Sequence, residues 1–143
     1  MNTANVNFLN VSSRLLTLTS SISVFASWEL LSKKAKRAVD SALSKEKIFI
    51  SSISAWEVAF LVYHKRLQLT LDAADWIAKS ERLPFFQFVP VDNAIAVKSV
   101  HLPKPLHSDP ADRIIIATAV SLGASLVTKD EKILNYPHVK TVW

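Results

Sequence analysis

The sequence predicts an α/β fold in which helices cover both faces of a mainly parallel sheet. From residue 32 onward, short apolar runs rich in β-branched residues alternate with stretches of helical periodicity. Such alternation is typical of parallel sheets, because the chain must cross over the sheet between successive parallel strands. The 143 residues, 50% of them hydrophobic, suffice for one domain with a real core, spanning residues 1–143.

The predicted elements follow from local patterns. Residues 32–43 form an amphipathic helix with a basic outer face, and residues 47–51 form a short apolar strand. Pro90 marks the strand at residues 85–91 as an edge strand or ends it there, since proline cannot donate to a sheet. Further helices are expected at residues 54–66, 72–82 and 92–101.

The C-terminal third has clear boundaries. Residues 102–108 contain two prolines, which predict a loop. Residues 109–122 predict a helix that stops at Gly123, because glycine readily adopts the left-handed conformation that ends helices. A strand at residues 124–128, a short helix at 130–135 and a last strand at 139–143 follow.

The composition excludes several classes of protein. The chain has no cysteine, so disulfides and thiolate metal sites are excluded, and its scattered histidines lack zinc-site spacing. A single glycine excludes the glycine-rich loops that bind nucleotide phosphates. The net charge of +5 favours a polyanionic partner such as nucleic acid. No segment has the roughly 18 uninterrupted apolar residues of a membrane span, so no membrane contact and a cytoplasmic location are expected.

Acidic residues stand where predicted strands lead into helices. Glu57 lies about one turn into the helix after the first predicted strand. Asp109 and Asp112 begin the long helix, and Asp130 follows the strand after it. If these strands are neighbours, the acids gather at one edge of the sheet, where they repel one another unless a cation lies between them. Mg²⁺ or Mn²⁺ prefers such oxygen ligands and activates water at phosphodiesters, as in metal-dependent nucleases.

Each acid also has a purely structural explanation, because acids favour helix N-termini. Asp109 suits an N-cap. The spacing of a capping box pairs Ser54 with Glu57 and Thr128 with Glu131. The second pair leaves Asp130 without a structural task. If capping explains all the acids, the chain is an unrelated α/β domain without metal affinity.

Several stretches resemble the VapC group of PIN-domain toxins. They are SSISAWEVA at residues 51–59, HSDPADRIIIATAVSLGASLVTKDEKIL at 107–134 and the closing Val142–Trp143. SKKAKRAV at residues 32–39 is similar to the family's first long helix. The likeness covers about residues 31–143, and residues 107–134 are its most specific part.

The resemblance implies a PIN-like three-layer α/β/α sandwich with Mg²⁺-dependent (or Mn²⁺-dependent) endoribonuclease activity toward RNA. It also implies a homodimer and a cognate antitoxin protein that blocks the site. Glu57, Asp112 and Asp130 match the family's second, third and fourth acidic positions, which implies that they are catalytic metal ligands. Asp109 matches an acid that accompanies the third, and is the remaining implied metal ligand.

The N-terminal segment departs from the family, whose opening strand ends in Leu-Asp-Thr-His or similar. The expected place is near residues 15–19, yet no acidic residue precedes Glu29. Residues 1–30 are therefore a divergent segment or contain an out-of-frame translation. Leu-Leu-Thr-Leu-Thr can be encoded as CTC TTG ACA CTC ACT, which from the third base reads Leu-Asp-Thr-His. Sequencing the gene over residues 15–30 tests this hypothesis.

The missing acid leaves a second function open: a catalytically inactive PIN domain that acts as a protein- or RNA-binding module. Other residues allow alternatives as well. His107 reaches a phosphate or is a plain loop residue, and Arg113 pairs with Asp109 or contacts phosphate. Trp56 is expected in the core or on a dimer face rather than as a base-stacking platform. The basic face of residues 32–43 is solvated or holds an RNA backbone.

Overall fold

The sheet of this computed structural model contains five parallel strands among the residues it describes, which are 15–16, 29, 31–45 and 48–143. The strand order is β3-β2-β1-β4-β5, and every neighbouring pair is parallel. The strands are β1 (Leu15–Leu16), β2 (Ile48–Ser51), β3 (Phe86–Val89), β4 (Ser125–Val127) and β5 (Thr141–Val142). The predicted parallel α/β architecture is confirmed.

β1, the first described strand of the chain, occupies the centre of the sheet. Leu15 pairs with Ile48 of β2 and Ser125 of β4, and Leu16 pairs with the next residue of each. This agrees with the expected position of the family's opening strand near residues 15–19. Residues 17–19 and most of the segment to residue 30 lie outside the described residues, as does the out-of-frame hypothesis that concerns them.

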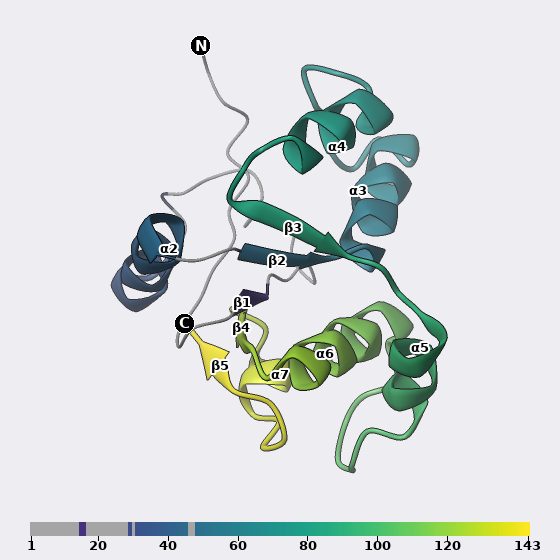
Figure 1. Ribbon diagram of the computed structural model, residues 1–143. Helices are drawn as coiled ribbons and strands as arrows, with labels where there is room; N and C mark the ends of the chain where they lie inside the picture. Colours follow the sequence, from purple (N-terminus) through teal and green to yellow (C-terminus); the bar gives the residue numbers. More distant parts are fainter. Residues whose placement is uncertain (1–14, 17–28, 30, 46–47) are drawn as a thin grey trace.

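Helices lie on both faces of the sheet. They are α2 (Lys33–Lys45), α3 (Ile53–Tyr63), α4 (Ala73–Glu81), α5 (Asn93–Val100), α6 (Pro110–Leu122) and α7 (Glu131–Leu134). Figure 1 shows α2 on one side of the strands and α5 and α6 on the other, with α3 and α4 stacked beside β3. None of these helices has the length and apolar character needed to cross a bilayer.

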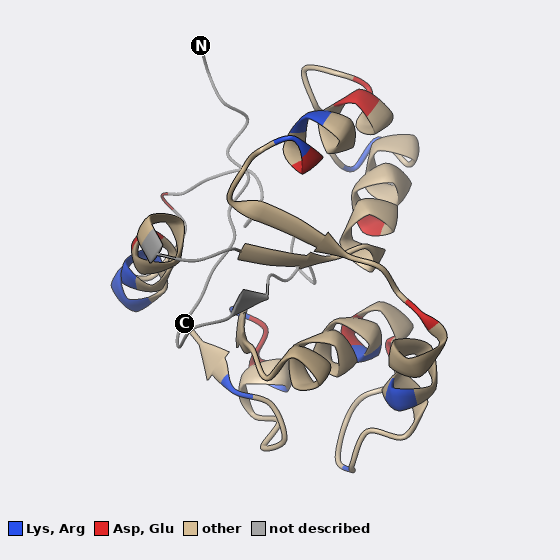
Figure 2. Ribbon diagram, viewed as in Figure 1, with Lys and Arg blue, Asp and Glu red and all other residues tan. Residues whose placement is uncertain are grey.

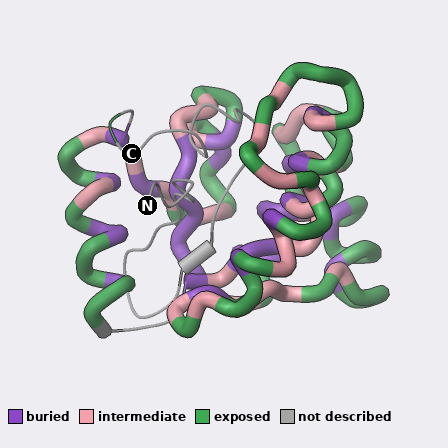
Figure 3. Tube along the Cα trace, turned by 90° about the horizontal axis from the view of Figure 1, so that it is seen from above, coloured by how far each residue is buried: buried purple, intermediate pink, exposed green. Residues whose placement is uncertain are grey.

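Alternate residues of the strands supply two hydrophobic cores. Ile48 and Ile50 of β2 pack with α2, α3 and α4 in one cluster, whereas Phe49 packs with α5 and α6 in the other. This alternation is the two-residue period of a strand with both faces covered. Figure 3 shows α2 with exposed residues outward and buried residues toward the strands. The basic residues of that helix lie across the molecule from α6, as Figure 2 shows.

Helix ends follow the predicted chemistry. Asp72 and Asp92 cap α4 and α5 by accepting hydrogen bonds from Asp75 N (3.0 Å) and Ile95 N (2.8 Å). Gly123 ends α6 with φ of 61°, the left-handed conformation that glycine adopts without strain. Every strand and helix predicted from residue 32 onward is present, and no predicted end differs from the observed one by more than three residues.

Candidate active site

The starts of three helices meet at the edge of the sheet where the strands end. α3 follows β2 and α7 follows β4, so both begin at that edge. α6 instead follows the loop after α5 and leads into β4, so it runs against the strands and also starts there. The expectation of three strand-to-helix junctions is therefore wrong for Asp112, and β2 and β4 are separated by β1 rather than adjacent.

A cavity of about 410 Å³ opens where these helices start. All four acids predicted from the sequence line it: Glu57, Asp109, Asp112 and Asp130. The other lining residues are Trp56, Phe60, Leu61, Arg66, His107, Ala111 and Lys132. Acids that are far apart in the sequence thus share one cavity.

Glu57 is held in α3 without a capping role. Ser52 occupies the N-cap position, and the side-chain oxygens Ser54 Oγ and Glu57 Oε2 are buried without a hydrogen-bond partner in the described part of the chain. The capping-box explanation of Glu57 is therefore wrong. Burial, with the nearby charges of Asp112 and Asp109, raises the pKa of Glu57 from 4.5 to about 8. Without a cation, its carboxyl group keeps its proton near neutral pH.

Asp112 is the most deeply buried of the four acids, with 5% of its surface exposed. Its Oδ2 accepts a hydrogen bond from His107 Nε2 at 2.7 Å, while its Oδ1 is buried and has no partner among the described residues. Burial raises the pKa of Asp112, the hydrogen bond from His107 opposes that rise, and the charges of Asp109 and Asp130 add to it. Asp112 therefore carries a buried carboxyl oxygen and also lines the cavity.

Asp109 and Asp130 cap helices as well as line the cavity. Asp109 accepts a hydrogen bond from Asp112 N at 3.0 Å, as predicted for an N-cap. Asp130 caps α7 by accepting from Lys132 N at 2.8 Å, so it does have a structural task. Thr128 Oγ1 accepts from Asp130 N at 2.9 Å, which differs from the predicted pairing of Thr128 with Glu131. These bonds fix the backbone of both acids at the cavity.

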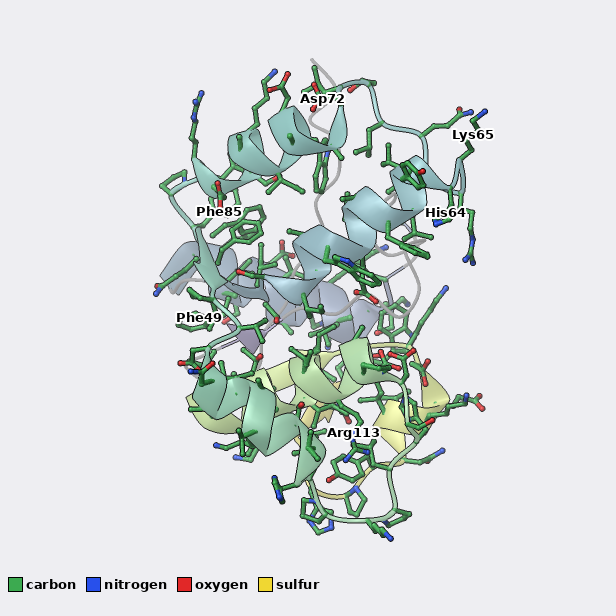
Figure 4. The ribbon with its side chains drawn as sticks, turned by 90° about the vertical axis from the view of Figure 1, so that its right-hand side faces the viewer. Phe49, His64, Lys65, Asp72, Phe85 and Arg113 are labelled. Atoms are coloured by element: carbon green, nitrogen blue, oxygen red, sulfur yellow. The ribbon has the colours of Figure 1, made fainter. Side chains whose placement is uncertain are left out.

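His107 is placed by a contact that sequence reasoning missed. Arg113 donates hydrogen bonds to the carbonyl oxygens of Ser99 (2.9 Å), Val100 (3.1 Å) and His107 (3.1 Å). The predicted pairing of Arg113 with Asp109 is wrong, since its guanidinium ties the end of α5 and the following loop to α6 (Figure 4). The alternative contact with phosphate stays a prediction. These Arg113 hydrogen bonds, here called the clamp, hold His107 next to Asp112. No sequence pattern indicates the His107–Asp112 pair, because a separation of five residues across a helix start matches no helical or strand period.

The donor set fits a hard divalent cation in part. Carboxylate oxygens are the preferred ligands of Mg²⁺ and Mn²⁺, and Glu57 and Asp112 each carry a buried oxygen without a partner. Within the described residues, however, no three acid or histidine side chains are grouped closely enough to hold a metal ion by themselves. Water or phosphate oxygens would have to complete the coordination of an ion bound here.

Comparisons with known proteins agree with one another. A family model described as the PIN domain matches residues 19–139. Ribonuclease VapC22 from Mycobacterium tuberculosis is 33% identical over 115 residues, which cover 79% of this chain and 85% of that protein.

Solved structures with a similar fold include a toxin–antitoxin complex. VapBC2 from Rickettsia felis, bound to a promoter DNA fragment, aligns with a TM-score of 0.63 at 17% identity, over 88% of this chain and 96% of that one. A toxin–antitoxin complex from Klebsiella pneumoniae aligns with a TM-score of 0.56 at 23% identity, over 87% and 93% of the two chains. At such identities the likeness shows the fold.

Replacing Glu57 with glutamine should flatten the pH dependence of stability measured without divalent ions. In the wild type, a carboxyl whose pKa is raised from 4.5 to about 8 keeps a proton that the unfolded chain releases. The free energy of unfolding therefore falls as pH rises through that window, by up to a few kcal/mol. Urea unfolding at several pH values measures the slope. Glu81→Gln, on exposed α4 surface, should keep the wild-type slope, and an unchanged slope in Glu57→Gln would contradict the raised pKa.

Proposed function

The chain belongs to the PIN domain family, and we propose that it is a metal-dependent endoribonuclease, the toxin of a toxin–antitoxin pair. The observation that carries the proposal is the shared cavity, which Glu57, Asp109, Asp112 and Asp130 line. Glu57 and Asp112 each also have a buried carboxyl oxygen without a hydrogen-bond partner among the described residues. Taking charged carboxylates out of water without hydrogen-bond donors costs several kcal/mol, so a site of this kind is unfavourable unless a cation offsets it.

The four acids and His107 have different proposed roles, which follow from their surroundings. Glu57 and Asp112 supply the buried oxygens, and Asp109 and Asp130 add negative charge at the rim. His107 fixes the orientation of Asp112 through its 2.7 Å hydrogen bond. Bound Mg²⁺ or Mn²⁺ would supply the Lewis acidity that activates water and stabilises charge on the scissile phosphate. No covalent enzyme intermediate is needed, since the chain has no cysteine to act as nucleophile.

RNA is the proposed substrate for two reasons. The relative VapC22 is named a ribonuclease, and the net charge of +5 favours a polyanion. A cognate antitoxin is the proposed protein partner, because structures of the same fold were solved as toxin–antitoxin complexes. The homodimer that the family resemblance implies stays a prediction.

A second function is favoured by one specific observation. β1 lies between β2 and β4 at the centre of the sheet, so its carboxyl end points toward the edge that carries the acids. No aspartate or glutamate follows it before Glu29. A chain that lacks an acid at this central position would retain the fold and the cavity but cut RNA slowly or not at all. It would then serve as a binding module.

Asp112→Asn should abolish Mg²⁺-dependent cleavage of RNA by the purified protein, with a loss of roughly 100-fold or more. The amide keeps the shape of the side chain and removes the charge that would hold the ion. Cleavage of a labelled RNA pool with and without Mg²⁺ measures the effect, and Glu81→Gln serves as the control acid outside the cavity. Cleavage by Asp112→Asn at the wild-type rate would sink the proposed site.

Thr17→Asp should raise the cleavage rate at least tenfold, roughly the effect of restoring one metal ligand or its support. Thr17 is the residue after Leu16, the last described residue of β1. The same cleavage assay compares this variant with Thr17→Asn, which matches it in shape but lacks the charge. If neither the wild type nor Thr17→Asp cleaves RNA, the binding module is favoured over the nuclease.

A further inference from the structure

A row of aromatic rings runs along α3 beside the acidic cavity. Trp56 and Phe60 stack with ring centroids 5.1 Å apart and planes 25° apart. Phe60 in turn contacts the ring of His64, 4.3 Å away, where α3 ends (Figure 4). The spacing of four residues places these rings on one side of the helix.

The row is exposed rather than part of the core. Trp56 retains 56% of its surface and Phe60 retains 40%. Trp76 and Phe86, by contrast, are buried in the core. An exposed indole is a large apolar surface left in water, and clusters of such surface commonly mark a binding site.

The position of Trp56 limits what can cover it. Trp56 and Phe60 line the same cavity as Glu57 and Asp112, because residue 56 precedes Glu57 on the first turns of α3. A chain that brings a phosphate to the acids enters a cavity that these rings help to line. Arg66 and Lys132 are both exposed and line the same cavity, where their charges are suited to phosphates flanking the reacting one.

We propose that Trp56, backed by Phe60, is a stacking platform for one unpaired base of the RNA strand next to the scissile phosphate. The inference rests on the proposed ribonuclease function and names its substrate class as single-stranded RNA. A base inside a duplex is already stacked on both faces, so only an unpaired base can cover the indole. Because Phe60 supports the indole from one side, the ring is held in place before the base arrives, which lowers the entropic cost of binding.

The platform is tested by binding of a fluorescently labelled single-stranded RNA decamer, without divalent ions so that no cleavage occurs. Trp56→Ala should weaken binding roughly tenfold, the effect expected of one base–aromatic stack. Trp56→Phe should restore most of the affinity, because it keeps a ring. Tyr63→Ala is the matched control, since Tyr63 is an 82% exposed aromatic on the same helix that does not line the cavity. A fully paired RNA duplex of the same length should bind equally weakly to the wild type and to Trp56→Ala.

Each other outcome overturns the platform in a recognisable way. Equal affinity of Trp56→Ala and the wild type, with Mg²⁺-dependent cleavage intact, would remove the platform and leave the proposed function standing. Unchanged RNA affinity together with a loss of self-association in sedimentation would assign the rings to an interface between copies of the chain. Absence of RNA binding and of cleavage in the wild type, and in Thr17→Asp, would reject both the platform and the nuclease. Thermal unfolding confirms that Trp56→Ala is folded, and Trp56→Phe carries the test if it is not.

Discussion

The burial of two carboxyl groups in one cavity is the constraint on which the rest of the site depends. Glu57 and Asp112 each hold an oxygen away from water without a hydrogen-bond donor, and Asp109 and Asp130 add their charge nearby. The fold accommodates this by starting three helices at one edge of the sheet, and by clamping the His107 loop through Arg113. A protein that needed only stability would fill such a cavity with apolar side chains. The free-energy cost of burying these carboxyl groups is explained if a divalent cation and a phosphate complete the site.

The central position of β1 decides what the cavity can do. Its two described residues pair with β2 on one side and with β4 on the other. Metal-dependent cleavage would require more than strand pairing from the same segment. An acid directly after β1 would lie between the acids that follow β2 and β4. The chain keeps the strand β1, but its sequence has no aspartate or glutamate between β1 and Glu29. The fold needs this segment to pair as a strand, and catalysis would need it to supply an acid. The sequence meets the first requirement.

Local patterns predicted most of the fold, since each helix and strand from residue 32 onward carries its own periodicity or cap. They also predicted that Glu57, Asp109, Asp112 and Asp130 gather in one place. The order of the strands, with β1 between β2 and β4, has no local signal because it depends on contacts between distant segments. The same reason hid the clamp formed by Arg113, whose partners lie six to fourteen residues away. Of the two places predicted for Trp56, the core is wrong, because the residue is exposed, whereas the dimer face stays a prediction.

The most direct test of the cation site is binding of Mn²⁺ followed by electron paramagnetic resonance, which counts bound ions without requiring catalysis. Wild-type protein, Asp112→Asn and the surface control Glu81→Gln would be titrated at a pH above about 8, where Glu57 is ionised. We expect one Mn²⁺ per chain in the wild type and in the control, and at least roughly tenfold weaker binding in Asp112→Asn. Equal binding by all three proteins would contradict a metal site built on these buried carboxylates.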